Sequence, residues 1–474
     1  MNVRNHSFSL EEGFLDNSNY LYQTDAILQN LLREYNVTQL PIPVNFRKLV
    51  NCFSSAERST HLIHSYPAKL LMHIPFFFLA NQRLSKPDDT VLDPFAGSGT
   101  VLLESLLSGR NALGAECNPL ARLIARVKTT PLDVSEIEST SSTIFEGATS
   151  NPKHPIPDVI NINHWFYPHV IEHLHSIVEK IASIADISIR EFFLVCLSQC
   201  VRKVSLADPR LSTPVRLKEE YPNGHRMRER AEKQLSYLKT VSVHDVFKDI
   251  LSANTRRIAT LEPLQNSPLE RKVNVLCSDA RKLHYEYPAS DQSPSLLPND
   301  SVQLVITSPP YPGAQKYVRC SSLSLGWLGL CPSNGFIELK SQTIGREEYR
   351  LSDCSQPVET GISEADNLLS EIWNDNPIRA TIAGKYLSEM RDALLEMHRV
   401  LRPNGYLVLV AANNHVCKRE FRTLNYLRCI AESIGFSTVL ELVDHIRSRG
   451  LMTKRNHTAS MITREGILVF GKGG

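Results

Sequence analysis

The sequence lacks the features that mark membrane and secreted proteins. No run among its 474 residues approaches the roughly 18 consecutive apolar residues that cross a bilayer. The longest apolar run, Ile74–Ala80, is too short and contains Pro75. The N-terminal segment carries no apolar stretch of the kind found in secretory signals. We therefore expect a cytoplasmic, globular protein.

Paired cysteines and an excess of charge are also missing. None of the ten cysteines forms a Cys-x-x-Cys pair, and Cys196 and Cys200 have no matching Cys or His pair at zinc-ligand spacing. His169, His173 and His175 do not converge with carboxylates, so no metal site is expected. The 52 Lys and Arg residues nearly balance the 50 Asp and Glu residues. This balance excludes a histone-like binder but allows a local basic groove.

Apolar segments of strand length alternate with helical patterns over much of the chain. The expected strands are 90–92, 112–115, 273–277, 302–306, 406–411, 438–443 and 466–470. The expected helices are 101–107, 119–127, 386–401 and 421–434. Such alternation is typical of an open α/β sheet with right-handed crossovers. Residues 159–264 indicate a large helical insertion, whereas the polar segments 130–157, 285–300 and 347–376 are predicted loops.

A glycine turn follows the first expected strand. Residues Asp93–Thr100 read Asp-Pro-Phe-Ala-Gly-Ser-Gly-Thr and lead into a helical pattern. Gly97 and Gly99 allow the backbone to approach a ligand, and the helix N-terminus offers free N–H groups. The turn is neither a P-loop nor a complete dinucleotide fingerprint. Glu116 ends the next strand as a candidate for ribose hydroxyls, and Asp279 ends the third as a candidate for an adenine amino group. A purely structural tight turn is the competing interpretation.

A second loop, Thr307–Tyr311, follows the strand at 302–306 and reads Thr-Ser-Pro-Pro-Tyr. The two prolines stiffen the backbone and remove two N–H donors. Carbonyl oxygens and the Ser308 hydroxyl remain as acceptors, and Tyr311 offers a ring for stacking. These are the groups that hold an exocyclic amino group of a base flipped out of a duplex. The competing interpretation is a proline-rich turn with a core tyrosine.

Together these two segments resemble the DNA amino-methyltransferases, which methylate exocyclic nitrogens. Asp93–Thr100 matches that family's S-adenosylmethionine motif, and Thr307–Tyr311 matches its catalytic (Asp/Asn/Ser)-Pro-Pro-Tyr motif. The serine form is most often seen in the cytosine-N4 branch. His64–Leu70 resembles a segment of bacterial restriction–modification enzymes that contributes to the methionine end of the cofactor pocket. The resemblance covers about residues 40–130, 270–320 and 385–470.

The resemblance implies a Rossmann-like methyltransferase sheet with S-adenosyl-L-methionine as cofactor. The predicted catalytic residues are Ser308, Pro309, Pro310 and Tyr311. The predicted cofactor-binding residues are Tyr66, Pro67, Ala68, Lys69, Asp93, Pro94, Phe95, Gly97, Ser98, Gly99, Thr100, Glu116, Cys117, Asn118, Asp279 and Ala280. The expected domains are an N-terminal extension (1–40), two parts of the methyltransferase domain (41–130 and 271–474), and a mostly helical insertion (131–270) that is the candidate DNA-recognition region.

Basic residues cluster in three places where DNA phosphates are expected to bind. The candidates are Arg226, Arg228 and Arg230 in the insertion, Lys316 and Arg319 after the second loop, and Arg447, Arg449, Lys454 and Arg455 near the end of the chain. For each cluster a solvated basic surface is the alternative. The resemblance also raises a cognate restriction endonuclease or another defence-system subunit as a partner.

The expected activity is therefore transfer of a methyl group from S-adenosylmethionine to N4 of cytosine in duplex DNA. Adenine-N6 methylation of DNA is the near alternative because the same loop geometry serves both amino groups. An RNA methyltransferase acting on guanine N2 and a cofactor-binding recognition subunit without turnover are the others. No Pro-Cys pair of the carbon-5 type is present, so no covalent cysteine intermediate is expected.

Overall fold

The computed structural model describes the parts of the chain that build the sheet and the helices around it. These parts are residues 23–50, 58–67, 69–146, 155–218, 220–221, 225, 227–265, 272–276, 279–285, 295–312, 317–346, 348–445 and 464–474. In them every helix is too short or too polar to cross a membrane.

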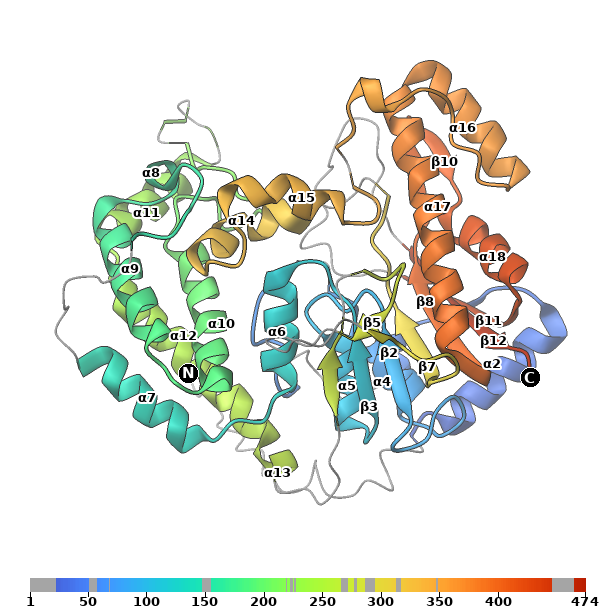
Figure 1. Cartoon of the computed structure of the whole chain (residues 1–474), viewed down its shortest axis with the longest axis horizontal. Helices are drawn as coiled ribbons and strands as arrows, with labels where there is room; N and C mark the ends of the chain where they lie inside the picture. The colour runs from blue at the N-terminus through green and yellow to red at the C-terminus, as the bar shows by residue number, and fades with distance from the viewer. Residues whose placement is uncertain are drawn as a thin grey trace.

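An eight-stranded sheet forms the centre of the fold (Figure 1). Its strands, in spatial order, are β1 (Ile42–Val44), β11 (Phe436–His445), β12 (Arg464–Lys472), β8 (Leu401–Ala411), β7 (Val302–Thr307), β2 (Thr90–Asp93), β3 (Asn111–Gly114) and β4 (Val273–Val275). Only β12 pairs antiparallel with its neighbours; the other pairs are parallel. The expected α/β methyltransferase sheet is thus confirmed, and β2, β3 and β7 point their carboxyl ends toward the same edge.

Helices cover both faces of the sheet, so the buried parts of its strands are apolar, whereas the ends of β8, β11 and β12 carry polar and charged residues. Alternate residues of β7 point to opposite faces: Leu304 and Ile306 join one core and Val305 joins the other. The first core contains residues of α2 (Asp25–Thr38), α3 (Phe46–Leu49) and α4 (His73–Leu79). The second contains α16 (Ser363–Asp375), α17 (Pro377–Val400) and α18 (Thr423–Ile434).

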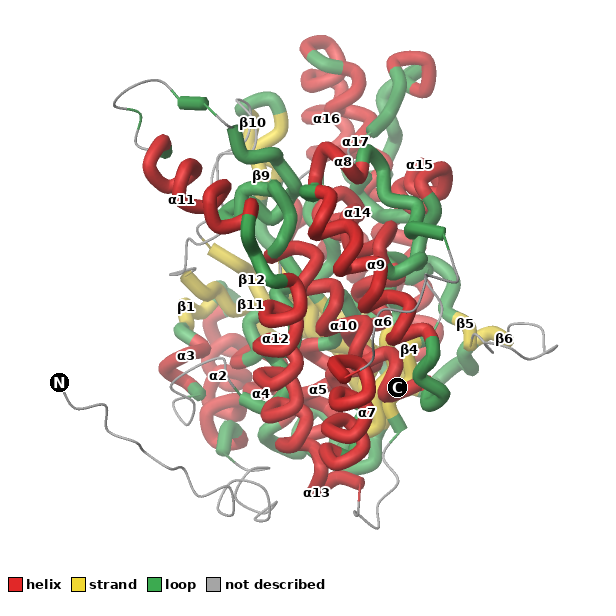
Figure 2. Tube along the Cα trace, turned by 90° about the vertical axis from the view of Figure 1, so that its left-hand side faces the viewer, coloured by secondary structure: helices red, strands yellow, loops and turns green. Residues whose placement is uncertain are grey.

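The predicted helical insertion forms a separate lobe beside α6 (Pro119–Thr129), seen on the left of Figure 1 and facing the viewer in Figure 2. Its helices are α7 (Val134–Glu146), α8 (Ile162–Trp165), α9 (Pro168–Ala182), α10 (Ile187–Lys203), α11 (Arg228–Lys239), α12 (Val243–Ile258) and α13 (Glu262–Gln265). Asp186 caps α10 by accepting from the Ile189 N–H at 2.7 Å. Helix α10 is central, because it packs against α6, α9 and α12.

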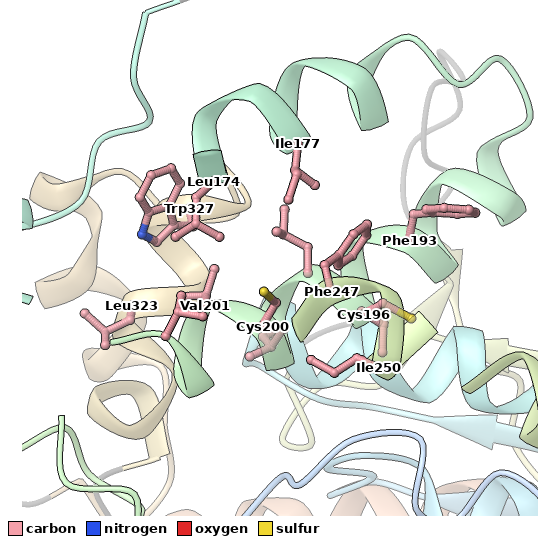
Figure 3. Close-up of a cluster of buried hydrophobic side chains, with 14 of the residues drawn as sticks. Leu174, Ile177, Phe193, Cys196, Cys200, Val201, Phe247, Ile250, Leu323 and Trp327 are labelled. Carbon is pink, nitrogen blue, oxygen red and sulfur yellow. The ribbon is translucent and has the colours of Figure 1, made fainter. Parts of the chain in front are cut away.

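The core of the lobe also receives side chains from α14 (Tyr317–Trp327), which follows the second loop. Figure 3 shows Leu323 and Trp327 facing Val201 of α10. Trp327 meets Phe166 edge-on, with ring centroids 5.6 Å apart, and both rings are fully buried. Phe166 is therefore a core anchor, and α14 joins the lobe to the part of the chain that carries the second loop.

Two of the predicted loops contain helices. Helix α7 lies in the Ser- and Thr-rich segment 130–157, because Ile137 and Ile144 are buried against the lobe. Helix α16 lies in segment 347–376, where Leu369 and Ile372 pack into the core shared with α17. Small and polar residues between the apolar ones obscured the helical periodicity in the sequence. Tertiary packing of the apolar residues stabilises both helices. Helix α17 also begins at Pro377, nine residues earlier than expected, with Asn376 as its N-cap.

Four short strands form two small pairs outside the main sheet, β5 (His284–Tyr285) with β6 (Ser295–Leu296) and β9 (Asn414–Val416) with β10 (Arg419–Phe421). Helix α5 (Thr100–Leu107) is buried against β2, β3, α4 and α6, and α15 (Phe336–Ser341) follows α14. Among them α5 and α15 bear on the site, because α5 begins directly after the glycine turn and α15 ends beside it.

Candidate active site

The tips of β2, β3 and β7 converge on one cavity. Its walls surround about 870 Å³ of space not filled by protein atoms, a volume that includes open solvent. The predicted residues that line it are Tyr66, Pro67, Lys69, Asp93, Pro94, Phe95, Gly97, Ser98, Thr100, Glu116, Cys117, Asp279, Ala280, Ser308 and Pro310. Segments about two hundred positions apart in the sequence thus meet over a shared space.

Asp93 joins the glycine turn to the second loop. Its Oδ1 atom accepts hydrogen bonds from Thr307 Oγ1 at 2.6 Å and from the Phe95 backbone N–H at 3.1 Å. The side chain is almost fully buried, and this burial raises the pKa of Asp93 to about 7 although both hydrogen bonds oppose the shift. The carboxyl group therefore fixes the relative position of the two loops.

The two glycines of the turn have different neighbours. A Cβ atom at Gly97 would meet only one atom within 4 Å, the Phe95 carbonyl oxygen at 3.9 Å, so the space beside Gly97 is open. A Cβ atom at Gly99 would lie 3.0 Å from Ala125 of α6. Both glycines have positive φ, at 50° and 76°. Gly97 therefore faces the cavity, whereas Gly99, which does not line it, permits close packing of α5 on α6.

Glu116 closes the glycine turn from the neighbouring strand. Its carboxylate accepts from the Gly97 N–H at 2.9 Å and from the Asn118 N–H at 2.8 Å. Burial raises the pKa of Glu116, and these backbone hydrogen bonds oppose the rise. Asn118 stands beside the cavity as the N-cap of α6 and donates to Tyr66 Oη at 3.1 Å. The end of β3 is thereby held to the segment that carries Tyr66.

Asp279 lies in an ion-pair chain at the other end of the cavity. Arg281 donates to both its carboxylate oxygens, at 2.9 and 3.1 Å, and reaches Glu389 of α17 at 3.4 Å. Glu389 accepts in turn from the Gly345 N–H at 3.3 Å. Burial raises the pKa of Glu389. This chain orients Asp279 and ties it to the segment that follows α15.

The second loop presents Ser308 and Pro310 to the cavity, while Pro309 and Tyr311 lie beside it. The Tyr311 hydroxyl donates to Glu465 Oε1 of β12 at 3.3 Å. Burial raises the pKa of Glu465, with Asp444 adding to the shift and the Tyr311 hydrogen bond opposing it. The Tyr311 ring is half-buried. It is therefore held from its hydroxyl end with part of its surface exposed.

Sequence reasoning missed one wall of the cavity. Gln342, Thr343 and Ile344, just after α15, line it beside Cys117. Thr343 Oγ1 lies 3.6 Å from Cys117 Sγ, and Gly345, with a φ of 73°, packs against the Tyr311 carbonyl. Thr307, which binds Asp93, was also not singled out for a role. No motif marks residues 342–344, and only Gly345 hints at a tight turn.

The helical lobe braces the back of the cavity through the segment before β2. Ser198 of α10 lies 2.7 Å from His64 Nε2, and Asn254 of α12 donates to the Ile63 carbonyl at 3.0 Å. Lys69, which lines the cavity, donates to the His61 carbonyl at 3.1 Å and also to that of His64. Ala68 lies outside the described residues. The segment is thus fixed from both sides.

The structure describes three of the basic residues predicted to bind DNA. Arg228 pairs with Glu232 at 2.8 Å on the surface of α11, and Arg230 and Arg319 are exposed. The others, Arg226, Lys316, Arg447, Arg449, Lys454 and Arg455, lie outside the described residues. Within the ranges that the structure covers, no group of three His, Cys, Asp or Glu side chains is placed to hold a metal ion.

The known proteins that resemble this chain in sequence are described as methyltransferases. The sequence model of a family described as DNA methylase matches residues 81–126, which contain the glycine turn. The Type II methyltransferase M.MvaI of Kocuria varians is 24% identical over 389 residues, which span 77% of this chain and 79% of that protein. M.MjaII of Methanocaldococcus jannaschii, another Type II methyltransferase, is 34% identical over 87 residues. The DNA adenine methyltransferase YhdJ of Escherichia coli is 34% identical over 134 residues.

These last two matches are partial. The M.MjaII match spans 18% of this chain and 16% of that protein, and the YhdJ match 24% and 43%. Among solved structures, a SAM-dependent methyltransferase from Methanosarcina mazei is 9% identical, with 82% of this chain and 95% of that one covered and a TM-score of 0.29. A structure from Thermus thermophilus complexed with S-adenosyl-L-methionine is 19% identical, covers 37% of this chain and 50% of that one, and has a TM-score of 0.20.

Proposed function

The chain belongs to the DNA amino-methyltransferase family, and we propose that it transfers a methyl group from S-adenosylmethionine to the exocyclic N4 of cytosine in duplex DNA. The observation that carries the proposal is the single cavity shared by the glycine turn and the Ser-Pro-Pro-Tyr loop. Each loop by itself is also explained as a purely structural turn. A cofactor turn and an amine-binding loop that face one space support group transfer between their ligands.

The residues of the cavity fit S-adenosylmethionine. Open space beside Gly97 leaves room for a ligand against the backbone, and Glu116 and Asp279 supply carboxylates at the ends of neighbouring strands. Glu116 would hold the ribose hydroxyls, Asp279 the adenine amino group, and Tyr66, Pro67 and Lys69 the methionine end. When bound, the cofactor supplies an electrophilic methyl group on its sulfonium.

The second loop would orient the amino group that receives the methyl group. The target base leaves the duplex and stacks on Tyr311, whose hydroxyl is anchored by Glu465. The Ser308 hydroxyl and the Pro309 carbonyl accept hydrogen bonds from the two N–H groups of the amino group. These bonds direct the nitrogen lone pair into the cavity. Asp93 holds Thr307 at the base of this loop, so the loop is preorganised. Since the sulfonium is a strong electrophile, positioning supplies much of the catalysis.

Cytosine N4 is favoured over adenine N6 because the loop begins with Ser308, the form most often seen in the cytosine-N4 branch. Adenine N6 is the second candidate, and one observation favours it: the 34% identity to a protein described as a DNA adenine methyltransferase. Duplex DNA is the proposed partner, with a restriction endonuclease in a restriction–modification setting. The helical lobe and the basic residues near it are the proposed DNA-reading region.

The decisive experiment identifies the modified base. Genomic DNA from a host expressing the protein is digested to nucleosides and analysed by mass spectrometry, with the same host lacking the protein as the control. N4-methyldeoxycytidine that appears only with the wild-type chain supports the proposal. N6-methyldeoxyadenosine alone would replace it with the second candidate. Transfer to tRNA but not to duplex DNA would support an RNA enzyme. No transfer to any nucleic acid would indicate a binding subunit.

A further inference from the structure

The segment 308–312, which contains most of the second loop, is poor in groups that could hold it in place by itself. Three of its five residues are proline, so it has two backbone N–H donors for five carbonyl oxygens. Asp93 fixes Thr307 before this segment, and Glu465 holds the hydroxyl of Tyr311. Neither contact holds the backbone that follows the Tyr311 ring. Pro312 is buried, so its carbonyl needs a donor from another part of the fold.

Asn414 supplies that donor. Its Nδ2 atom donates to the Pro312 carbonyl at 3.2 Å, and its Oδ1 atom accepts from the His415 backbone N–H at 2.7 Å. A carbonyl oxygen only accepts and a backbone N–H only donates, so a single orientation of the amide forms both bonds. Asn414 is only 8% exposed, and its bond to Pro312 joins residues 102 positions apart. The amide therefore ties the end of the second loop to a distant part of the chain.

The element that carries Asn414 is itself well supported. Strand β9 begins three residues after the end of β8, which is the parallel neighbour of β7. Asn414 pairs with Phe421 across the β9–β10 hairpin. The buried Phe421 ring meets Tyr426 of α18 edge-on, with ring centroids 5.0 Å apart. The hairpin and its packing on α18 thus fix the backbone of Asn414, which is the support that a residue needs to position a loop.

We propose that Asn414 is a positioning residue for the second loop, and that its bond to the Pro312 carbonyl sets the orientation of the Tyr311 ring toward the extruded base. The inference rests on the proposed function and adds a residue outside both sequence motifs. Asn414 is not among the residues that line the cavity, so it acts on the rate of transfer and not on cofactor binding. A displacement of about 1 Å near the reacting groups costs about 100-fold in rate.

The first test removes the donor. Asn414→Ala should lower the single-turnover rate of methyl transfer to duplex DNA roughly 10- to 100-fold, with DNA and cofactor both saturating. The dissociation constant for S-adenosylhomocysteine, the demethylated cofactor, should stay within about twofold because the cavity is unchanged. DNA affinity should also change little, since phosphate contacts supply most of it.

Asn413→Ala is the matched control. Asn413 is the preceding residue, and its Oδ1 atom accepts from the Leu424 backbone N–H at 3.1 Å near the start of α18. The control therefore loses a side-chain hydrogen bond to the backbone of the same part of the fold, but no contact with the second loop. It should keep the wild-type rate per folded molecule.

Asn414→Asp gives a readout that a merely structural role would not. Aspartate has nearly the same shape, but its carboxylate has no donor for the Pro312 carbonyl, whereas the protonated carboxyl group has one. The rate of Asn414→Asp relative to wild type should therefore rise as pH falls, by up to the roughly 10- to 100-fold that Asn414→Ala loses. The same ratio for Asn414→Ala should stay flat. Asn414→Asp carries the test if Asn414→Ala does not fold.

The outcomes distinguish a failure of this inference from a failure of the proposed function. A wild-type rate in Asn414→Ala, a flat pH ratio for Asn414→Asp, or an equal loss of rate in Asn413→Ala would overturn the role of Asn414 while leaving the methyltransferase intact. A loss of S-adenosylhomocysteine affinity as large as the loss of rate would overturn it too. A wild-type protein that methylates no DNA and does not bind S-adenosylhomocysteine would overturn the proposed function itself.

Discussion

The cavity at the sheet edge and the core of the helical lobe contain different kinds of buried side chain. The cavity is bordered by buried polar groups, including Asp93 and Ser98, whereas the lobe is filled by apolar side chains such as Phe193 and Phe247. Apolar burial stabilises a fold directly, while buried polar groups are costly unless they are paired. The apolar core of the lobe therefore serves stability and the cavity serves ligands, so we expect a truncation in that core to change stability more than catalysis.

The largest expected effect is a loss of stability caused by a substitution in the core of the lobe. Phe247→Ala removes a fully buried ring that contacts Phe145 and Phe193 at centroid distances of 6.0 and 6.4 Å. We expect the free energy of unfolding to fall by about 3–5 kcal/mol, measured by denaturant titration. Methyl transfer per folded molecule should be preserved at low temperature. Phe247→Leu, the control, should cost about 1 kcal/mol. A selective loss of catalysis at unchanged stability would contradict the division.

At the second loop we expect the opposite result, a loss of activity without a loss of stability. Ser308→Ala removes one acceptor for the amino group and should cost about 2–4 kcal/mol of transition-state stabilisation, by analogy with oxyanion donors. This corresponds to roughly a 30- to 1000-fold lower single-turnover rate, with melting temperature and cofactor affinity unchanged. Ser322→Ala is the matched control, because Ser322 on α14 donates only to the Arg319 carbonyl on the surface in the described contacts. Full activity in Ser308→Ala would remove the serine from the mechanism.

The buried carboxyl of Asp93 predicts a pH dependence of stability that originates at the cavity. Its pKa is raised from 3.8 to about 7 in the folded chain, so the folded state binds a proton that the unfolded state releases. The stabilisation from the neutral form is therefore complete below about pH 4 and is lost as pH rises to about 7. The unfolding free energy of wild type minus that of Asp93→Asn should fall over this window in chemical denaturation. A flat difference would show that Asp93 titrates normally.

The smallest effect is expected at Asp279, where we propose that adenine binds. Arg281→Gln breaks the ion pairs with Asp279 and Glu389, which are partly exposed and so contribute about 0–1 kcal/mol. We expect S-adenosylhomocysteine to bind about two- to fivefold more weakly, with the rate at saturating cofactor unchanged. Arg402→Gln breaks a similar pair with Asp89 just before β2 and serves as the control. A large loss of rate would instead indicate that Arg281 orients the second loop.

Most of the sheet could be predicted because its strands are short, apolar and bounded by turns. All seven expected strands formed, and the glycine turn and the Ser-Pro-Pro-Tyr loop lie at the tips of β2 and β7. Helices α7 and α16 were hidden, since small and polar residues outnumber the apolar ones that packing later buries. Strand β1 was missed because three residues are too few for a pattern. Its pairing with β11 defines it as a strand, which its own sequence does not indicate.

The sequence by itself determined the two loops and suggested the chemistry that we propose for them, because each loop is encoded within eight consecutive residues and depends on local backbone geometry. Only the tertiary structure decided that Asp93 binds Thr307 and that Asn414 binds the Pro312 carbonyl. It likewise placed Gln342, Thr343 and Ile344 on the wall of the same cavity. These contacts join residues distant along the chain, and strand order and helix packing bring them together, so no local pattern contains them.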